Sequence, residues 1–218
     1  YEDLRRQAAR ELAGLGFDGF GIGGALEKAQ IGTIVRWVCE ELPDDRPRHL
    51  LGIGEPDDVI TAVDNGADTF DCVAPSRNAR NGTVFHPVKR FHLTNGVYRR
   101  DFNPIDETCD CYTCTHYTRA YEHHLFKAKE MLAATLATIH NERYIVRLVD
   151  QIRASIQDGT LADLRDRANA VAGARFNSVL ANLYRDGTDS MGAHKDDERE
   201  FGVRPVIASV NRFSLRSI

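Results

Sequence analysis

The stretch Cys109-Asp110-Cys111-Tyr112-Thr113-Cys114 places three thiols within six residues, in a C-x-C-x-x-C arrangement. Thiols this close in sequence converge on one point when a metal ion binds between them. Zn²⁺ takes four tetrahedral ligands from Cys and His, and three Cys with one His form a common closed, structural set. The spacing therefore predicts a structural zinc site, around which the rest of the chain is organised. The alternative is three reduced thiols in a loop.

We expect the fourth ligand to be His140, which lies in Thr138-Ile139-His140-Asn141 near the middle of a long helical pattern. A helix can carry its ligand back to a knuckle formed by the three cysteines. Three other histidines near the cluster are alternatives for this position: His116, His123 and His124.

Composition describes an ordinary globular protein: of 218 residues, 42% are hydrophobic and 28% are charged. The net charge of −4 argues against a generally basic nucleic-acid-binding protein but allows a local basic patch. Five cysteines, three of them clustered, indicate metal binding in a reducing compartment rather than a disulfide framework. We expect a cytoplasmic protein without a membrane span or a signal peptide. Because the chain starts at Tyr1 inside a helical pattern, we also expect an incomplete N-terminus.

The first third of the chain alternates between helical and strand-like segments. Helical spacing of apolar residues covers residues 1–15 and 31–42, and Pro and acidic residues in a first turn predict a third helix at residues 55–66. Short apolar runs predict strands between these helices and at 69–73. This alternation is typical of parallel βα units, either in a (β/α) barrel or in an open doubly wound sheet. Both folds place functional groups at the C-terminal ends of strands, where Gly23, Gly24 and Asp71 stand.

The next segments predict a hairpin-like region and a long helical region. Asn81-Gly82 and Asn95-Gly96 are turn pairs typical of β-hairpins, within residues 78–103. Residues 117–158 are strongly helical, either as one helix or as two with a bend near Asn141, and Gly159 ends the pattern.

Taken together, these segments resemble the tRNA-guanine transglycosylases, a family that inserts queuine or its precursor into tRNA. The resemblance runs from residue 1 to about residue 160, and the order and separation of its motifs make it specific. The matching segments are 21–24, 46–54, 70–82, 101–106, the cysteine cluster, 121–126 and 140–141.

The resemblance implies an α/β fold, namely the C-terminal part of a (β/α)₈ TIM barrel with a zinc-binding subdomain at about residues 100–145. It also implies exchange of guanine 34 in the tRNA anticodon for queuine or its precursor, and a homodimer in full-length members. The family's earlier barrel strands, which carry a general-base aspartate and most groups that grip the purine, have no counterpart here. We therefore expect that this chain alone does not exchange guanine at a useful rate.

The resemblance also implies roles for five residues. Asp71 matches the family's nucleophile, which attacks the ribose C1′ to form a covalent aspartyl-ribosyl intermediate. Gly23 and Gly24 match a turn that lets backbone groups approach the flat base. Arg77 and Arg80 match residues that contact the anticodon. On residue type alone, the aspartate also suits a turn or a helix N-cap, the glycines a plain turn, and the arginines a solvated surface.

Residues 161–218 resemble a different family, the AlkB-type Fe(II)/2-oxoglutarate dioxygenases, which remove alkyl groups from nucleic-acid bases. This implies a short β-rich, jelly-roll fragment joined to the first domain, residues 1–160. His194 and Asp196 match the H-x-D part of a 2-His-1-carboxylate Fe²⁺ site, and Asn182 and Tyr184 match residues that contact 2-oxoglutarate. Since the second His ligand has no counterpart, we expect no dioxygenase turnover.

Three functions are therefore open. The first is a tRNA-guanine transglycosylase present as its C-terminal part. The second is an AlkB-like dioxygenase that carries a borrowed N-terminal segment. The third is a non-catalytic zinc-bearing module that binds tRNA or another partner.

Overall fold

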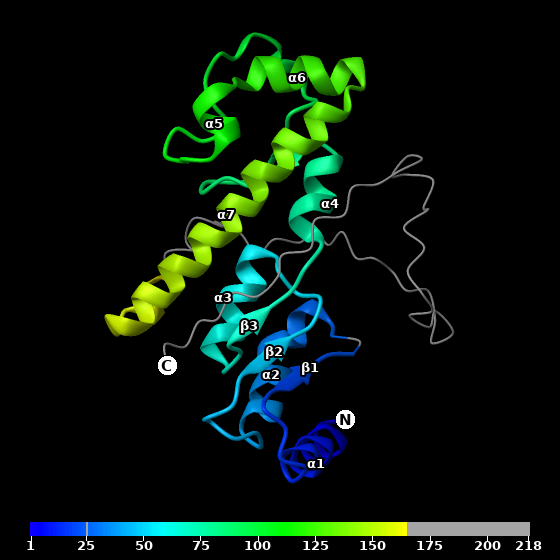
Figure 1. The fold of residues 1–218 in the computed structure, drawn as a ribbon, viewed down its shortest axis with the longest axis vertical. Helices are drawn as coiled ribbons and strands as arrows, with labels where there is room; N and C mark the ends of the chain where they lie inside the picture. The colour runs from blue at the N-terminus through cyan, green and yellow to red at the C-terminus, as the bar shows by residue number, and fades with distance from the viewer. Residues whose placement is uncertain (25, 165–218) are drawn as a thin grey trace.

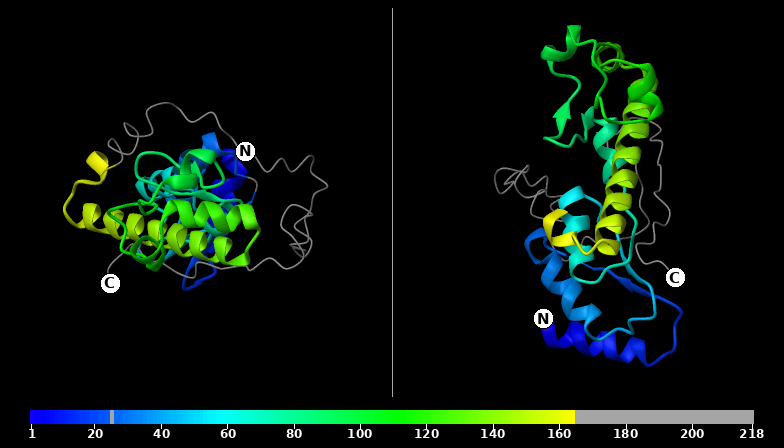
Figure 2. Two further views of the ribbon diagram at one scale, coloured as in Figure 1. Left: turned by 90° about the horizontal axis from the view of Figure 1, so that it is seen from above. Right: turned by 90° about the vertical axis from the view of Figure 1, so that its left-hand side faces the viewer.

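The computed structural model describes residues 1–24 and 26–164 and is elongated (Figure 1). A small sheet lies near one end, and helices α5 (Tyr112–His116) and α6 (Arg119–Ala128) lie at the other. The longest helix, α7 (Met131–Gln157), runs between the two ends, as Figure 1 and the right-hand view of Figure 2 show.

Three parallel strands form the sheet in the order β1-β2-β3, so that each strand neighbours the next one along the chain. The βα alternation predicted from the sequence is confirmed, although the strands are short. The strands are β1 (Phe20–Ile22), β2 (Arg48–Leu50) and β3 (Thr69–Phe70), and the connecting helices are α2 (Ile31–Cys39) and α3 (Pro56–Asp64).

The two faces of this sheet differ in burial. Ile22, Leu50 and Phe70 point to a face that is packed against α2, α3 and the C-terminal half of α7. On the other face, His49 and Thr69 are only half-buried. The buried residues of the core are Ile22, Ile31, Val35, Cys39, Leu50, Val59, Ile60, Ala62, Val63, Ala67, Phe70, Phe85, Ile145, Val149 and Ile152.

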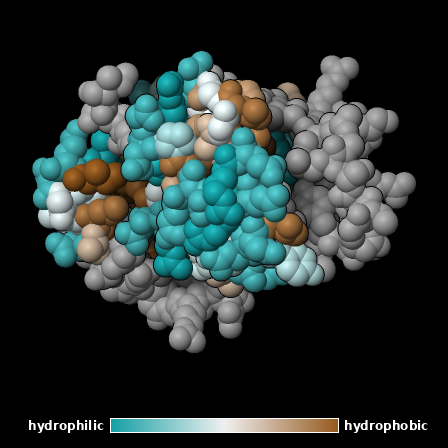
Figure 3. Space-filling model, turned by 90° about the horizontal axis from the view of Figure 1, so that it is seen from below, coloured by the Kyte–Doolittle hydropathy of each residue, from teal (hydrophilic) through white to brown (hydrophobic). Residues whose placement is uncertain are grey.

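Helix α1 (Glu2–Ala13) packs against α2 at the sheet end of the molecule. The surface seen from that end is largely hydrophilic, with separate hydrophobic areas (Figure 3). Four large apolar side chains of α1 and the segment after it are exposed: Leu4, Leu12, Leu15 and Phe17.

The expected hairpin exists, but its turn is not where the sequence placed it. Strands β4 (Thr83–Val84) and β5 (Phe91–His92) pair antiparallel, and residues 85–90 connect them. Asn81-Gly82 instead ends helix α4 (Ala74–Arg80), with Gly82 at a φ of +75°. A helix end and a tight hairpin both need a residue in the left-handed region, and glycine supplies it in either case.

Of the two alternatives for residues 117–158, the structure has two helices, but the bend near Asn141 is wrong. The helical region does divide in two, but the break falls at Lys129, which adopts a φ of 60° after α6. Helix α7 continues through Asn141 and ends where Gly159 was expected to stop it. Gly159 has a φ of +72°, and the Thr160 N–H donates to the Ser155 carbonyl at 2.7 Å, which closes the last turn.

The dioxygenase-like segment lies outside the described residues from residue 165 onward. The expected jelly-roll fragment and its four candidate residues, Asn182, Tyr184, His194 and Asp196, therefore fall in the part of the chain that the structure does not describe. Within the described part, no helix has the length and apolar character needed to cross a membrane.

Candidate metal centre and strand-end site

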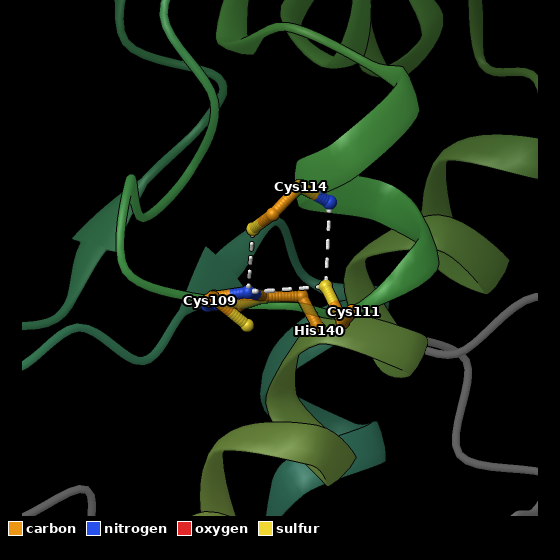
Figure 4. Close-up of side chains that lie close together, drawn as sticks. All are labelled: Cys109, Cys111, Cys114 and His140. Carbon is orange, nitrogen blue, oxygen red and sulfur yellow. Dashed lines mark hydrogen bonds between the residues drawn. The ribbon is translucent and has the colours of Figure 1, made fainter.

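The four predicted zinc ligands come together in the structure. The sulfurs of Cys109, Cys111 and Cys114 and a ring nitrogen of His140 all lie within 4.8 Å of one another (Figure 4). All four residues are buried, and His140 is fully so. Four ligands around a tetrahedral Zn²⁺ with Zn–S bonds of 2.3 Å have edges of about 3.8 Å. The buried cluster of three Cys and one His therefore fits a structural zinc site.

The orientation of His140 suits a metal ligand. Its Nδ1 faces the sulfurs, 3.2 Å from Cys114 and 3.8 Å from Cys111. Its Nε2 lies 2.7 Å from the carbonyl oxygen of Phe85. Because a carbonyl only accepts, Nε2 carries the proton, and the Nδ1 lone pair is left for the metal.

Electrostatics within the cluster also favour a cation. Hydrogen bonds with Cys111 and Cys114 hold the pKa of Cys109 far below its ordinary value, and the same network raises the pKa of Cys114. Burial alone would lower the pKa of His140, but its hydrogen bonds with Cys109 and Cys111 raise it to about 9. The cluster thus gathers negative charge on sulfur in a buried place, and a bound Zn²⁺ would replace the shared protons.

Neighbouring contacts fix the cysteine loop against α7. Arg143 makes two hydrogen bonds to the carboxylate of Asp110, at 2.8 and 2.7 Å. The hydroxyl of Thr113 donates to the carbonyl of Leu136 at 2.6 Å. These contacts hold the segment that carries the three thiols against the helix that carries the fourth ligand.

The alternative histidine ligands have other contacts. His116 is exposed, and its Nδ1 lies 2.9 Å from the carbonyl oxygen of Tyr112. The buried His123 directs its Nδ1 to the Leu93 carbonyl at 2.8 Å. His124 is exposed on α6. Among the described residues, only His140 joins the three cysteines in a group that could hold a metal ion.

Asp71 directly follows β3, at the C-terminal end of the parallel sheet. Its Oδ1 lies 3.0 Å from Nε2 of His49 on the neighbouring strand β2, and it accepts the Gly52 N–H at 3.2 Å. Its side chain is 46% exposed, so the carboxylate is both held and accessible.

The glycine pair stands at the same edge of the sheet. Gly23 directly follows β1, and its carbonyl accepts a hydrogen bond from Arg5 of α1 at 2.8 Å. Gly24 adopts a φ of +98°, a conformation that favours glycine. Because β2 lies between β1 and β3, the ends of β1 and β3 are about 10 Å apart.

Arg77 and Arg80 lie in the last turn of α4, and both are half-buried. They share the helix that begins three residues after Asp71. The two arginines therefore lie in the helix that follows β3, and the candidate nucleophile Asp71 lies between that strand and that helix.

Sequence reasoning gave no role to His49 or to the amide of Asn141. The signal for His49 was strand alternation: it pairs with Thr69, two residues before Asp71, so both side chains point to the same face. Asn141 is fully buried and forms three hydrogen bonds, accepting from the Phe85 N–H and donating to the carbonyls of Pro75 and Thr83.

Comparison with known proteins agrees with this geometry. The family model described as queuine tRNA-ribosyltransferase matches residues 1–172. The queuine tRNA-ribosyltransferase of Thermoanaerobacter pseudethanolicus is 48% identical over 168 residues, which are 76% of this chain and 45% of that protein. That of Symbiobacterium thermophilum is 48% identical over 169 residues, 76% of this chain and 42% of that protein. That of Pasteurella multocida is 47% identical over 161 residues, 72% and 42% respectively. The chain spans less than half the length of these relatives.

Proposed function

The chain belongs to the queuine tRNA-ribosyltransferase family, and from this we propose that it supplies the nucleophile and the structural zinc centre of a tRNA-guanine transglycosylase. The proposed reaction exchanges guanine 34 in the tRNA anticodon for queuine or its precursor, in the cytoplasm. The observation that carries the proposal is Asp71, an accessible carboxylate held at the end of a parallel strand.

The chemistry follows from a carboxylate in that place. A lone pair of Asp71 forms a bond to C1′ of the ribose while the C1′–N9 bond breaks. The bonding pair leaves on guanine, which takes up a proton from water. In the second step the incoming base loses a proton to water and attacks C1′. The ester bond breaks and its electron pair returns to the carboxylate. Gly23 and Gly24 would lie against the flat base, because residues without side chains allow close approach.

The proposed architecture is the C-terminal part of a (β/α)₈ barrel, followed from about residue 161 by a separate segment. In such a barrel, helices cover the outer face of the sheet, and the inner face carries the site at its C-terminal edge. The buried face against α2, α3 and α7, and the partly open face that carries His49 and Thr69, support this arrangement.

Arg77 and Arg80 would contact the anticodon of the tRNA, since guanidinium groups pair with phosphates and stack on bases. A second copy of the chain is the proposed protein partner, as in full-length members of the family. The exposed aromatic surface of α5 and α6 supports a contact there: Tyr112 is 52% exposed, and the rings of Tyr117 and Tyr121 stack at 5.2 Å.

A second candidate is a zinc-bearing module that binds tRNA without catalysis. It is favoured by one observation, namely the buried cluster of three Cys and one His, which supports a structural zinc site whether or not Asp71 reacts. The dioxygenase reading rests on residues outside the described part and gains no support from the comparisons.

The test replaces the 168 matching residues of the Thermoanaerobacter pseudethanolicus relative with the matching residues of this chain, which gives a joined protein. We expect the joined protein to exchange labelled guanine in tRNA and to form a covalent tRNA adduct, and the chain alone to show no useful exchange. Asp71→Asn in the joined protein should abolish both signals. Binding of tRNA without an adduct in a folded, zinc-loaded joined protein would favour the non-catalytic module. Full activity of Asp71→Asn would remove the proposed nucleophile.

A further inference from the structure

We infer that His49 is a positioning residue, which holds one oxygen of Asp71 and leaves the other free to react, while Thr69 orients the imidazole. The inference rests on the proposed function, because it assigns the atoms of the proposed nucleophile. It concerns two side chains on β2 and β3 that the sequence analysis left without a role.

Two hydrogen bonds converge on a single oxygen of the carboxylate. Nε2 of His49 lies 3.0 Å from Oδ1 of Asp71, and the backbone N–H of Gly52 donates to the same atom at 3.2 Å. Within residues 1–24 and 26–164, no hydrogen bond reaches Oδ2 of Asp71. The carboxylate is therefore fixed through Oδ1, and Oδ2 is the oxygen available to a substrate.

The partners of His49 also define its tautomer. A carboxylate only accepts hydrogen bonds, so Nε2 must carry a proton. In the neutral ring Nδ1 is then an acceptor, and it lies 2.7 Å from the hydroxyl of Thr69. Since His49 and Thr69 are register partners in adjacent strands, the sheet itself sets this chain of contacts: Thr69 donates to His49, and His49 donates to Asp71.

This arrangement serves both steps of a double displacement. Oδ2 forms the bond to C1′ as the bond to the departing base breaks, and Oδ1 becomes the carbonyl oxygen of the ester. When the second base attacks C1′, the Oδ2–C1′ bond breaks and the negative charge returns to the carboxylate. The donors at Oδ1 are already in place to stabilise that charge. His49 keeps its proton throughout, so its role is positioning and not proton transfer.

The contact is not needed to hold the strands together. Strands β2 and β3 already pair through their backbones, and the exposed side-chain fractions are 30% for His49 and 46% for Asp71. A pair placed only for stability would contribute little at that exposure. At the open edge of the sheet, the same pair fixes the direction of the reactive oxygen.

The first experiment uses the full chain and needs no activity. Nuclear magnetic resonance of ¹⁵N-histidine-labelled protein, above the pH range where histidine titrates, should show the His49 proton on Nε2, protected from exchange with water. In Asp71→Ala this protection should disappear, and in Asp71→Asn it should persist because the amide oxygen still accepts. A proton on Nδ1 in the wild type, or protection that survives Asp71→Ala, would overturn the inference.

The second experiment measures adduct formation in the joined protein described above. His49→Leu should slow formation of the tRNA adduct by about 10- to 100-fold, the effect of one hydrogen bond to a charged group. The dissociation constant for tRNA should stay within about twofold, and His49→Gln should recover much of the rate, since its side-chain N–H can reach Oδ1. Thr69→Val should slow the step, and Thr69→Ser should restore it.

The two proposals can fail separately. A wild-type joined protein that is folded but forms no adduct contradicts the proposed function, and the resonance experiment still decides whether His49 holds Asp71. Adduct formation in His49→Leu at the wild-type rate, or an equal loss of rate in His49→Gln and His49→Leu, would overturn the positioning role.

Discussion

The side chain of His140 donates from Nε2 to the carbonyl oxygen of Phe85 at 2.7 Å, across 55 residues of sequence. The next residue, Asn141, accepts the N–H of the same Phe85 at 2.8 Å. Two consecutive residues of α7 thus satisfy both backbone polar groups of one residue after β4. The metal centre and the β4–β5 hairpin are therefore parts of one hydrogen-bonded unit. A substitution in one of them should also change the stability of the other.

The first prediction concerns metal content. We expect about one zinc per chain, because the three thiols and the His140 imidazole make a complete tetrahedral set. His140→Ala should lower the zinc content and the melting temperature together, since it removes a ligand and the bond to Phe85. Chelation of the wild-type protein should lower the melting temperature in the same direction. Elemental analysis and calorimetry measure both effects.

Matched controls come from the other histidines near the cluster. His116→Ala and His124→Ala change exposed side chains and should keep the zinc content of the wild type. Zinc far below one per chain in the wild-type protein, or a loss in the two controls equal to that in His140→Ala, would contradict the assigned ligand set.

The second prediction concerns Asn141, whose buried amide forms three hydrogen bonds. Asn141→Ala leaves the Phe85 N–H and two carbonyls without these partners, and we expect a loss of about 2–4 kcal/mol in the free energy of unfolding. Urea unfolding measures it. Asn65→Ala is the control, because within the described residues the half-buried Asn65 side chain makes one hydrogen bond, to the Thr61 carbonyl of its own helix, and its loss should cost less than about 1 kcal/mol. Equal losses in the two variants would contradict the role of Asn141.

The metal centre was predictable because three of its four ligands lie close together in the sequence. Three ligands lie within six residues, and Cys and His have few other reasons to occur at that spacing. The parallel βα units were also predictable, since the alternation of apolar patterns is visible within short windows. These features depend on residues that are close together along the chain.

Features that depend on strand register or on backbone conformation were not predictable in the same way. His49 and Asp71 are 22 residues apart, and only the pairing of β2 with β3 brings them together. Gly82 has a backbone conformation in the left-handed region, which suits the end of a helix as well as a hairpin turn. The pair Asn81-Gly82 alone therefore does not distinguish the two. The break at Lys129 uses a positive φ in a residue that carries no sequence signal for it.

The third prediction concerns Glu122 and pH. This side chain is fully buried, and within the described residues neither carboxylate oxygen has a hydrogen-bond partner. Burial raises its pKa to about 8. Between about pH 5 and pH 8 the unfolded chain releases this proton while the folded chain keeps it, so stability should fall as pH rises, by up to about 1.4 kcal/mol per pH unit. Glu122 contributes fully to the free energy of unfolding below its pKa in the unfolded chain, and this contribution is lost above its pKa in the folded chain.

Urea unfolding of zinc-loaded protein across that pH range tests this expectation. Glu122→Gln should make the decrease of the free energy of unfolding with pH less steep, by up to about 1.4 kcal/mol per pH unit, because the amide does not ionise. Glu130→Gln changes an exposed carboxylate and should leave the slope as in the wild type. If the slope of Glu122→Gln equals that of the wild type, the buried carboxyl does not hold its proton in this range.

The fourth prediction concerns Gly54, which packs against the residue that follows the candidate nucleophile. A Cβ at position 54 would overlap the Cβ of Cys72, so that Gly54→Ala forces the segment after β3 to move. We expect a loss of about 1–3 kcal/mol in the free energy of unfolding and slower adduct formation, because Asp71 moves with its neighbour. A Cβ at position 96 would meet no atom of the described residues within 4 Å, so Gly96→Ala should be nearly neutral. Cys72→Gly removes the clashing atom, so the double variant should be more stable than the sum of the two single losses predicts. If the stability losses of the two single variants add up exactly in the double variant, positions 54 and 72 do not contact each other. Gly54 would then have no effect on the placement of Asp71.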